Sequence, residues 1–225
     1  MERLILLARA PSLDRVKTRL TPPLSKEQAL ALHVAMLEDQ IRFVAGLRAP
    51  SREAELCLDT EWSPASSLPA IRRTSQGDGD LGARMARALT RAFEEGAGAA
   101  VIVGGDAPTL PAALVEEAFA ALASGARAVV TPALDGGYVL IGATPPPPPL
   151  FAGVPWGTAE VLDATRRLAR GASIVLHETR AWGDVDTIAD LRRLSVEIRA
   201  DPERAPSTQA ALTTLRLYSG EDPVV

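Results

Sequence analysis

Asp106 stands where a carboxylate could do chemistry in an α/β protein. It follows the apolar run Ala99–Val103 and a pair of glycines, Gly104 and Gly105. Such a run predicts a strand buried on both faces of a parallel sheet, and ligands bind beyond the carboxyl ends of such strands. A carboxylate at that place suits Mg²⁺ or Mn²⁺. A turn aspartate that accepts a backbone N–H is the alternative, and these residues alone leave both interpretations open.

A pair of carboxylates lies further along the chain, where Asp184 and Asp186 flank Val185 just before a predicted helix. If this segment is extended, the two side chains point the same way, and they repel each other unless a cation lies near them. Acids also favour the N-terminus of a helix by about 0.3–1 kcal/mol, but one acid is enough for that role. We therefore interpret the pair as further metal ligands.

A basic loop follows the predicted strand Leu4–Ala8. This loop, residues 9–22, contains one acid, Asp14, among several cations. A basic loop after the first strand of an α/β sheet is where the phosphates of a nucleotide would lie. The alternative is a loop whose cations face water. Counted with the carboxylates, the cations favour phosphate binding, and they are Arg9, Arg15, Lys17 and Arg19.

Two glycine-containing turns complete the candidate residues. The stretch Gln76–Arg84 precedes a helical pattern, so it either contacts a ligand or simply caps that helix through Asp80. The second turn, residues 135–137, is Asp-Gly-Gly, which ordinarily forms a hairpin. It is also the second aspartate-plus-glycine turn at a predicted strand end, which favours a site. The residues concerned are Gly79, Asp80, Leu81 and Gly82 in the first turn and Asp135, Gly136 and Gly137 in the second.

Alternating strands and helices must position these residues, and they predict a three-layer α/β/α sandwich with a Rossmann-like, mostly parallel sheet. Strands are predicted at residues 4–8, 53–59, 71–74, 99–103, 127–132, 138–141 and 172–177. Helices are predicted at residues 25–45, from the first glycine turn to residue 95, from about 109 to 123, at 158–170, from 187 onward and at 207–217. Ser25 with Gln28 and Thr187 with Asp190 fit capping boxes. Residues 219–225 are expected to fray.

The composition is that of an ordinary globular protein, with 225 residues, 47% hydrophobic and 23% charged. A net charge of −4 makes nucleic acid an unexpected partner. The lone Cys57 excludes an intrachain disulfide and a cysteine-rich zinc site, and we interpret it, His33 and His177 as structural. Without a signal peptide or an apolar run near ~18 residues, we expect no membrane span and a cytoplasmic location.

Five short motifs now occur in order: Lys17-Thr18-Arg19-Leu20, Gly79-Asp80-Leu81-Gly82, Gly105-Asp106-Ala107-Pro108, Asp135-Gly136-Gly137-Tyr138 and Asp184-Val185-Asp186-Thr187. Together they resemble the bacterial DUF2064 group, often labelled glycosyltransferase-like. That group is similar to the nucleotide-diphospho-sugar transferase fold, which A-type glycosyltransferases share with the molybdenum-cofactor and phospholactate guanylyltransferases. The resemblance covers about residues 3–195 of one domain, 1–225, and leaves a helical tail, 196–225.

The resemblance implies a role for each motif. Lys17 and Arg19, with Arg9, would hold the diphosphate, and residues Gly79–Gly82 would lie against the nucleotide base. Asp106 would bind Mg²⁺ or Mn²⁺, with Asp184 or Asp186 as the second ligand. Asp135 is a candidate base for an acceptor hydroxyl, and the side that binds the sugar or acceptor would comprise Gly136, Gly137, Tyr138 and Trp156.

Three activities follow as expectations. The first is sugar transfer from a nucleoside diphosphate donor to an unknown acceptor, by one chain or a dimer. The second is nucleotidyl transfer, in which a nucleoside triphosphate joins a phosphorylated small molecule and pyrophosphate leaves. The third is a non-catalytic nucleotide-binding module. Leu7-Ala8-Arg9-Ala10 replaces the glycine loop of nucleotidyltransferases, which favours sugar transfer.

Overall fold

Seven strands form one mixed sheet in the computed structural model, which describes residues 1–65 and 67–217. Their spatial order is β3-β2-β1-β4-β6-β5-β7. The pairing is parallel throughout except for β6, which is antiparallel to both of its neighbours. The bounds are β1 Glu2–Ala8, β2 Arg52–Leu58, β3 Arg72–Ser75, β4 Ala99–Gly104, β5 Ala128–Pro132, β6 Tyr138–Ala143 and β7 Leu176–Glu178.

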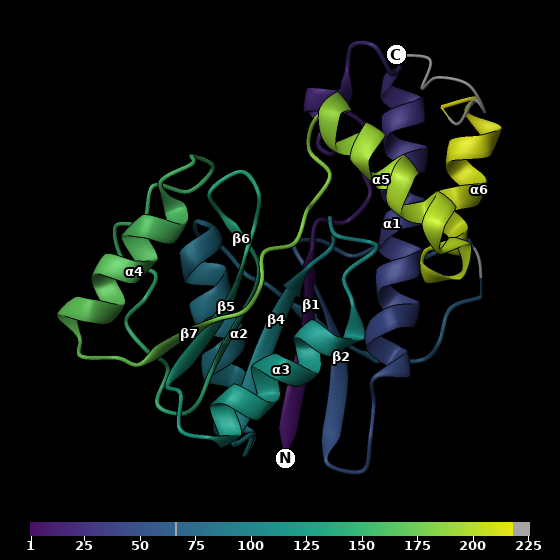
Figure 1. The fold of residues 1–225 in the computed structure, drawn as a ribbon. Coiled ribbons are helices and arrows are strands. Elements are labelled where there is room, and N and C mark those ends of the chain that lie inside the picture. The colour runs from purple at the N-terminus through teal and green to yellow at the C-terminus, as the bar shows by residue number, and fades with distance from the viewer. Residues whose placement is uncertain (66, 218–225) are drawn as a thin grey trace.

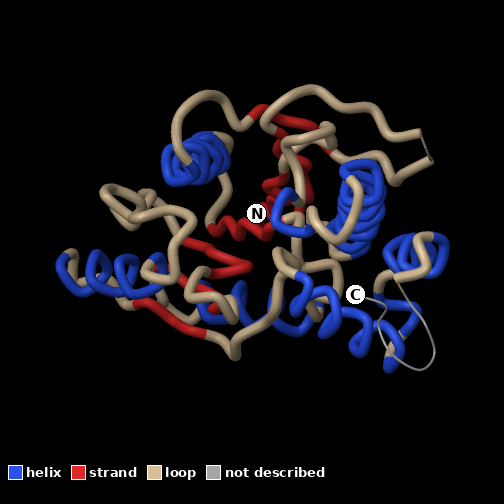
Figure 2. Tube along the Cα trace, turned by 90° about the horizontal axis from the view of Figure 1, so that it is seen from above, coloured by secondary structure: helices blue, strands red, loops and turns tan. Residues whose placement is uncertain are grey.

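Helices cover both faces of this sheet, so the predicted three-layer α/β/α arrangement is confirmed (Figures 1 and 2). Side chains of α1 and α3 pack on one face with Leu4 and Leu6, whereas α2 and α4 pack on the other face with Ile5 and Leu7. Burial of both faces explains why β1 is apolar from Leu4 to Ala8 rather than alternating. The four helices are α1 Lys26–Gly46, α2 Leu81–Glu94, α3 Ala112–Ala123 and α4 Val161–Gly171.

Two further helices, α5 Ile188–Ala200 and α6 Pro206–Thr214, pack against the outer side of α1 (Figure 1). Their apolar residues meet Leu32 and Met36 of α1 in a separate cluster. Asp39 joins the two parts, because its carboxylate accepts hydrogen bonds from the backbone N–H groups of Ser207 and Thr208 at the start of α6. No helix in the described ranges is long and apolar enough to cross a membrane.

The parallel strands bring their carboxyl ends to one edge of the sheet. The loops after β1, β3, β4, β5 and β7 therefore open on the same side, and each carries one of the five motifs. Both predicted capping boxes are present, at Ser25 with Gln28 and at Thr187 with Asp190. The second of these fixes where the chain leaves the Asp184–Asp186 segment.

The region after α4 differs from expectation. The predicted strand 172–177 shortens to three residues, because Ala172, Ser173 and Ile174 still donate backbone hydrogen bonds to the last turns of α4. Helix α4 itself begins at Val161 rather than at Thr158, whose hydroxyl bonds the carbonyl of Pro155 in a preceding turn. The predicted fraying of residues 219–225 lies outside the described residues.

The Asp-Gly-Gly turn is the hairpin that joins β5 and β6. Asp135 Oδ1 accepts a hydrogen bond from the N–H of Gly137 at 2.9 Å, and Ala133 N–H donates to the Gly137 carbonyl. Gly136 has a φ of +92°, and a Cβ there would overlap the carbonyl oxygen of Ala159. Its own carbonyl accepts from the N–H of Leu162 at 2.9 Å. The turn thus supports the start of α4 through contacts that only glycine permits.

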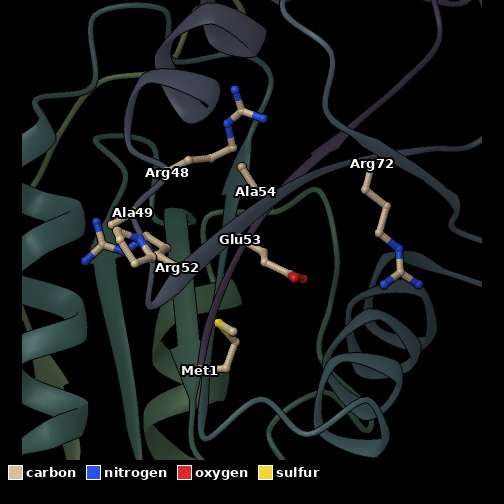
Figure 3. A pocket seen from close by; sticks show the side chains of 8 residues that line it. Met1, Arg48, Ala49, Arg52, Glu53, Ala54 and Arg72 are labelled. Carbon is tan, nitrogen blue, oxygen red and sulfur yellow. The ribbon is translucent and has the colours of Figure 1, made fainter.

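A network of ion pairs closes the opposite end of the sheet. Glu55 of β2 is fully buried and accepts hydrogen bonds from Arg3, Arg91 and Thr74. An open hollow of about 670 Å³ lies beside this network, lined by Arg48, Arg52 and Arg72 (Figure 3). Arg52 pairs with Glu2 and Glu116, and Arg72 pairs with Glu95, so these two cations are already compensated by carboxylates.

Neutralising the buried carboxylate should cost more than neutralising its exposed neighbour. Glu55→Gln leaves the Arg3 and Arg91 guanidinium groups without their counter-charge, which should lower the free energy of unfolding by about 3 kcal/mol. Glu53 also pairs with Arg3 but its side chain is 53% exposed, so Glu53→Gln should cost under about 1 kcal/mol. Urea unfolding followed by circular dichroism measures both, and equal costs would contradict this account.

A methyl group at position 136 should be poorly tolerated. Gly136→Ala combines a left-handed backbone with an overlap on Ala159, and should destabilise the protein by about 2 kcal/mol or more. Gly153 is the matched control, because it also has a positive φ, +70°, but a Cβ there would meet nothing within 4 Å. Gly153→Ala should therefore cost only the backbone term of about 1 kcal/mol. Thermal unfolding of both variants tests the difference.

Candidate functional site

The Lys17 ammonium is the centre of the candidate site. Its Nζ lies 2.5 Å from Asp106 Oδ1, 2.6 Å from the Val185 carbonyl oxygen and 3.3 Å from Asp186 Oδ1. The Lys17 side chain is only 3% exposed, whereas those of Asp106 and Asp186 are 46% and 38% exposed. The cation is thus enclosed, while the carboxylates that hold it also face solvent.

Three separate segments deliver these groups. Asp106 follows β4, where a Cβ at Gly105 would lie 2.8 Å from that of Ala8, so glycine lets the ends of β4 and β1 approach. The Asp106 carbonyl accepts from the Val185 N–H at 2.9 Å, which fixes the 184–186 segment beside β4. Lys17 comes from the loop after β1 and has a left-handed backbone, with φ 50° and ψ 34°.

The electrostatics follow from this arrangement. Burial alone would lower the pKa of Lys17, but Asp106 and Asp186 outweigh it, and the pKa of the ammonium is raised. Desolvation likewise opposes ionisation of Asp106, yet the nearby Lys17 charge holds its pKa below the ordinary value. Both groups are therefore charged at neutral pH.

Asp184 is in the reverse situation. Burial, together with the negative charges of Asp135 and Asp186, raises the pKa of Asp184 to about 6. Burial is the larger cause, and the neighbouring carboxylates add to it. The contribution of Asp135 shows that the loop after β5 lies near the 184–186 segment.

The predicted metal ligands are near one another but do not form a ready-made cage. Within the part of the chain that the structure describes, no three His, Cys, Asp or Glu side chains lie together as a metal-binding group. The donor set nevertheless fits a hard cation, because two carboxylate oxygens and a backbone carbonyl already converge on a positive charge. The Lys17 ammonium thus occupies the place of a metal ion, and its position marks where Asp106 and Asp186 could hold Mg²⁺ or Mn²⁺.

The other cations predicted to bind phosphate differ in how they lie relative to the Lys17 ammonium and its carboxylates. Arg19 is mostly exposed, and its Nη1 lies 3.6 Å from Asp186 Oδ2. Arg9 is also exposed; its guanidinium bonds the carbonyl of Arg15, and its positive charge contributes to lowering the Asp106 pKa. Arg15 instead pairs with Asp59 at the end of β2. Lys17 and Arg19 are therefore placed at the carboxylates, and Arg9 is close enough to act on them.

The loop after β3 is held by Asp80, which the sequence indicated, and by Gln76 and Arg84, which it did not single out. Asp80 caps α2 by accepting from the Ala83 N–H at 2.8 Å, so the capping interpretation is confirmed. Buried Gln76 donates to the carbonyls of Ala8 and Cys57, which ties the loop to the ends of β1 and β2. Arg84 bonds the carbonyl of Gly79 at 2.9 Å. Leu81 is exposed at the start of the helix.

The residues predicted to bind the sugar or acceptor are tightly packed, which the sequence did not indicate. A Cβ at Gly82 would lie 2.8 Å from the Trp156 ring, which itself packs edge-on against Tyr138 with ring centroids 6.3 Å apart. Burial raises the pKa of the Tyr138 hydroxyl. Gly136 packs directly against Ala159, and the Gly137 N–H donates its hydrogen bond to Asp135. These residues bring the loop before α4 onto the start of α2, and their contact with substrate stays a prediction.

His33 was interpreted from the sequence as structural, and that account is incomplete. Its Nε2 lies 3.0 Å from the carbonyl oxygen of Arg9, while Nδ1 is 4.0 Å from Asp106 Oδ1. Burial lowers the pKa of the imidazole, although Asp106 opposes this. The sequence placed His33 beside the apolar face of a helix, but only the packing of α1 against β1 and the loop after β4 brings it to Asp106.

Comparison with known proteins agrees with this geometry. The profile of DUF2064, described as uncharacterized proteins conserved in bacteria, matches residues 44–158. A crystal structure from Desulfovibrio desulfuricans G20, described only provisionally as a nucleotide-diphospho-sugar transferase, is 30% identical with a TM-score of 0.83. That match covers 96% of this chain and 97% of the other. No protein of curated function matches.

More distant solved structures also match this chain. A cytidylyltransferase from Leptospira borgpetersenii is 11% identical with a TM-score of 0.52, over 98% of each chain. Rv0371c from Mycobacterium tuberculosis H37Rv, crystallised in complex with manganese, is 17% identical with a TM-score of 0.45, over 86% of this chain and 98% of that one. The family profile and the Desulfovibrio structure identify the chain: it belongs to the DUF2064 family and has the nucleotide-diphospho-sugar transferase fold.

Proposed function

We propose that this protein is a metal-dependent transferase that takes a sugar from a nucleoside diphosphate donor and passes it to an acceptor hydroxyl. The observation that carries the proposal is the Lys17 ammonium between Asp106, Asp186 and the Val185 carbonyl. A positive charge is held by oxygen ligands at the carboxyl end of the central strand, where this fold class binds ligands. The same place needs a cation when a diphosphate lies there.

The chain's own groups divide the work around the donor. When the diphosphate binds, Lys17 exchanges its carboxylate contacts for phosphoryl oxygens, and Arg19 adds a second cation from the same loop. The carboxylates of Asp106 and Asp186 that Lys17 leaves then hold Mg²⁺ or Mn²⁺. A bound divalent cation would neutralise the charge that builds on the leaving diphosphate.

The transfer itself needs a base and a leaving group. The acceptor oxygen bonds to the anomeric carbon, and the bond from that carbon to the phosphate oxygen breaks, so the nucleoside diphosphate departs with the bonding electrons. Asp135 takes the hydroxyl proton in this proposal, because it lies near Asp184 and the other carboxylates at this edge. One of its oxygens is engaged with the Gly137 N–H, which orients the carboxylate.

The product released distinguishes this reaction from nucleotidyl transfer. Purified protein is incubated with Mn²⁺, a panel of sugar nucleotides or nucleoside triphosphates, and an extract of small-molecule acceptors. Release of nucleoside diphosphate supports sugar transfer. Release of pyrophosphate from a triphosphate would instead assign nucleotidyl transfer, and the absence of nucleotide binding by calorimetry with UDP, GDP, GTP and CTP would contradict both.

Removing the Asp106 charge should abolish metal binding. Asp106→Asn loses the carboxylate that contacts the stand-in cation most closely, so Mn²⁺ affinity in the presence of UDP or GDP should fall about ten-fold or more. Asp163→Asn is the control, because Asp163 is exposed on α4 and pairs only with Arg166. Isothermal titration calorimetry measures both variants. Unchanged Mn²⁺ affinity in Asp106→Asn would overturn the assignment of this ligand.

Removing the Lys17 ammonium should have opposite effects on the two ligands. In Lys17→Met, nucleoside diphosphate binding should weaken about ten-fold, since a charge-assisted hydrogen bond contributes about 1.5–3 kcal/mol. Mn²⁺ alone should bind more tightly, because no ammonium competes for Asp106 and Asp186. Lys26→Met, which removes an exposed lysine paired with Asp14, should change neither. Weaker Mn²⁺ binding in Lys17→Met would show that Lys17 does not occupy the metal position.

A further inference from the structure

His33 has one ring nitrogen whose position is not explained by packing. The side chain is 5% exposed and extends from α1 toward the ends of β1 and β4. Its Nε2 lies 3.0 Å from the Arg9 carbonyl oxygen, which can only accept, so Nε2 carries the hydrogen. That assignment leaves Nδ1 as a lone pair. Nδ1 is buried and has no hydrogen-bond partner among the described residues.

The unpartnered lone pair faces another acceptor. Nδ1 lies 4.0 Å from Asp106 Oδ1, with no hydrogen on either atom. Lys17 Nζ already contacts Asp106 Oδ1, but Nδ1 has no such partner, so its lone pair is satisfied only if a positive species also reaches it. The bond from Nε2 to Arg9 suffices to anchor α1 to the first loop, so a structural role accounts for only one of the two ring nitrogens.

The separation of the two atoms fits a shared ion. Imidazole nitrogen and carboxylate oxygen each bind divalent metals at about 2.1 Å, so two ligands of one ion are at most about 4.2 Å apart. The observed 4.0 Å falls inside that limit. Metal-bound histidines also characteristically donate their second N–H to a backbone carbonyl, which fixes the ring and the tautomer. The Arg9 carbonyl provides that support here.

We propose that His33 ligates the divalent cation through Nδ1, beside Asp106. This inference rests on the proposed metal-dependent function and adds a nitrogen ligand to an otherwise oxygen-only set. An imidazole favours transition metals over Mg²⁺, so the site is selective for Mn²⁺ or a related ion. When the diphosphate binds and Lys17 leaves the carboxylates, His33 would hold the ion together with Asp106 from the α1 side.

The decisive experiment detects nitrogen on the bound metal. The chain has two histidines, so a His177→Gln variant labelled with ¹⁵N-histidine has His33 as the single labelled ring. His177 is a suitable residue to remove, because it is partly exposed and contacts Glu117 at 3.2 Å. Mn²⁺ is added alone and with UDP, and electron–nuclear double resonance is recorded. A directly coordinated imidazole gives a ¹⁵N hyperfine splitting that no nucleotide nitrogen can produce.

A second variant supplies the thermodynamic readout. His33→Gln should abolish the ¹⁵N splitting and weaken Mn²⁺ binding about ten-fold or more, with a smaller effect on Mg²⁺. His177→Gln in unlabelled protein should leave both affinities unchanged. Circular dichroism and the thermal midpoint establish that each variant is folded.

The outcomes separate the two proposals. If Mn²⁺ binding requires Asp106 but the labelled protein shows no ¹⁵N splitting, His33 is not a ligand, and the proposed function still stands. Failure of Mn²⁺ to bind any variant, with or without UDP, overturns the metal-dependent function and His33 ligation with it. Splitting in the His177→Gln protein supports the assignment directly.

Discussion

A buried ammonium is the constraint on which the candidate site at the carboxyl edge of the sheet depends. Lys17 is almost fully enclosed, and an enclosed charge is stable only if opposite charges and hydrogen-bond acceptors surround it. Those partners come from the end of β4 and from the segment before α5, so the first loop, the central strand and the approach to α5 must meet at one point. The Val185 N–H also donates a hydrogen bond to the Asp106 carbonyl, which joins the end of β4 to the segment before α5 through the backbone alone.

The two charged networks of the molecule differ in what they permit. At one end of the sheet, Glu55 is sealed among arginines and is fully satisfied, which suits a permanent role in stability. At the other end, Asp106 and Asp186 hold Lys17 but remain partly exposed, so a ligand can compete for the same charges. Burial, with the added charges of Asp135 and Asp186, raises the pKa of Asp184 beside them. Such an arrangement suits a site that exchanges one cation for another.

Several motif residues have a structural role in addition to any functional one. Asp80 caps α2, Asp135 stabilises the hairpin, and Gly82 and Gly136 permit close contacts with Trp156 and Ala159. Glycines and aspartates suit tight turns and ligand contacts for the same physical reasons, namely backbone freedom and a short acceptor side chain. The sequence could therefore locate these turns but could not show their structural contacts, which packing revealed for Asp80 and Gly136, and their contact with a ligand stays a prediction.

The sequence by itself determined the strands, the three-layer class, both capping boxes and the presence of cations and carboxylates at strand ends. These properties depend on local periodicity and on residues a few positions apart. Only the tertiary structure decided that Lys17 lies among the carboxylates, because it bonds Val185 across 168 positions of the chain. The approach of His33 to Asp106 and the shortening of β7 likewise depend on how helices pack and end. Asp106, Lys17 and Asp186 were identifiable from the sequence, but their contacts with one another were not.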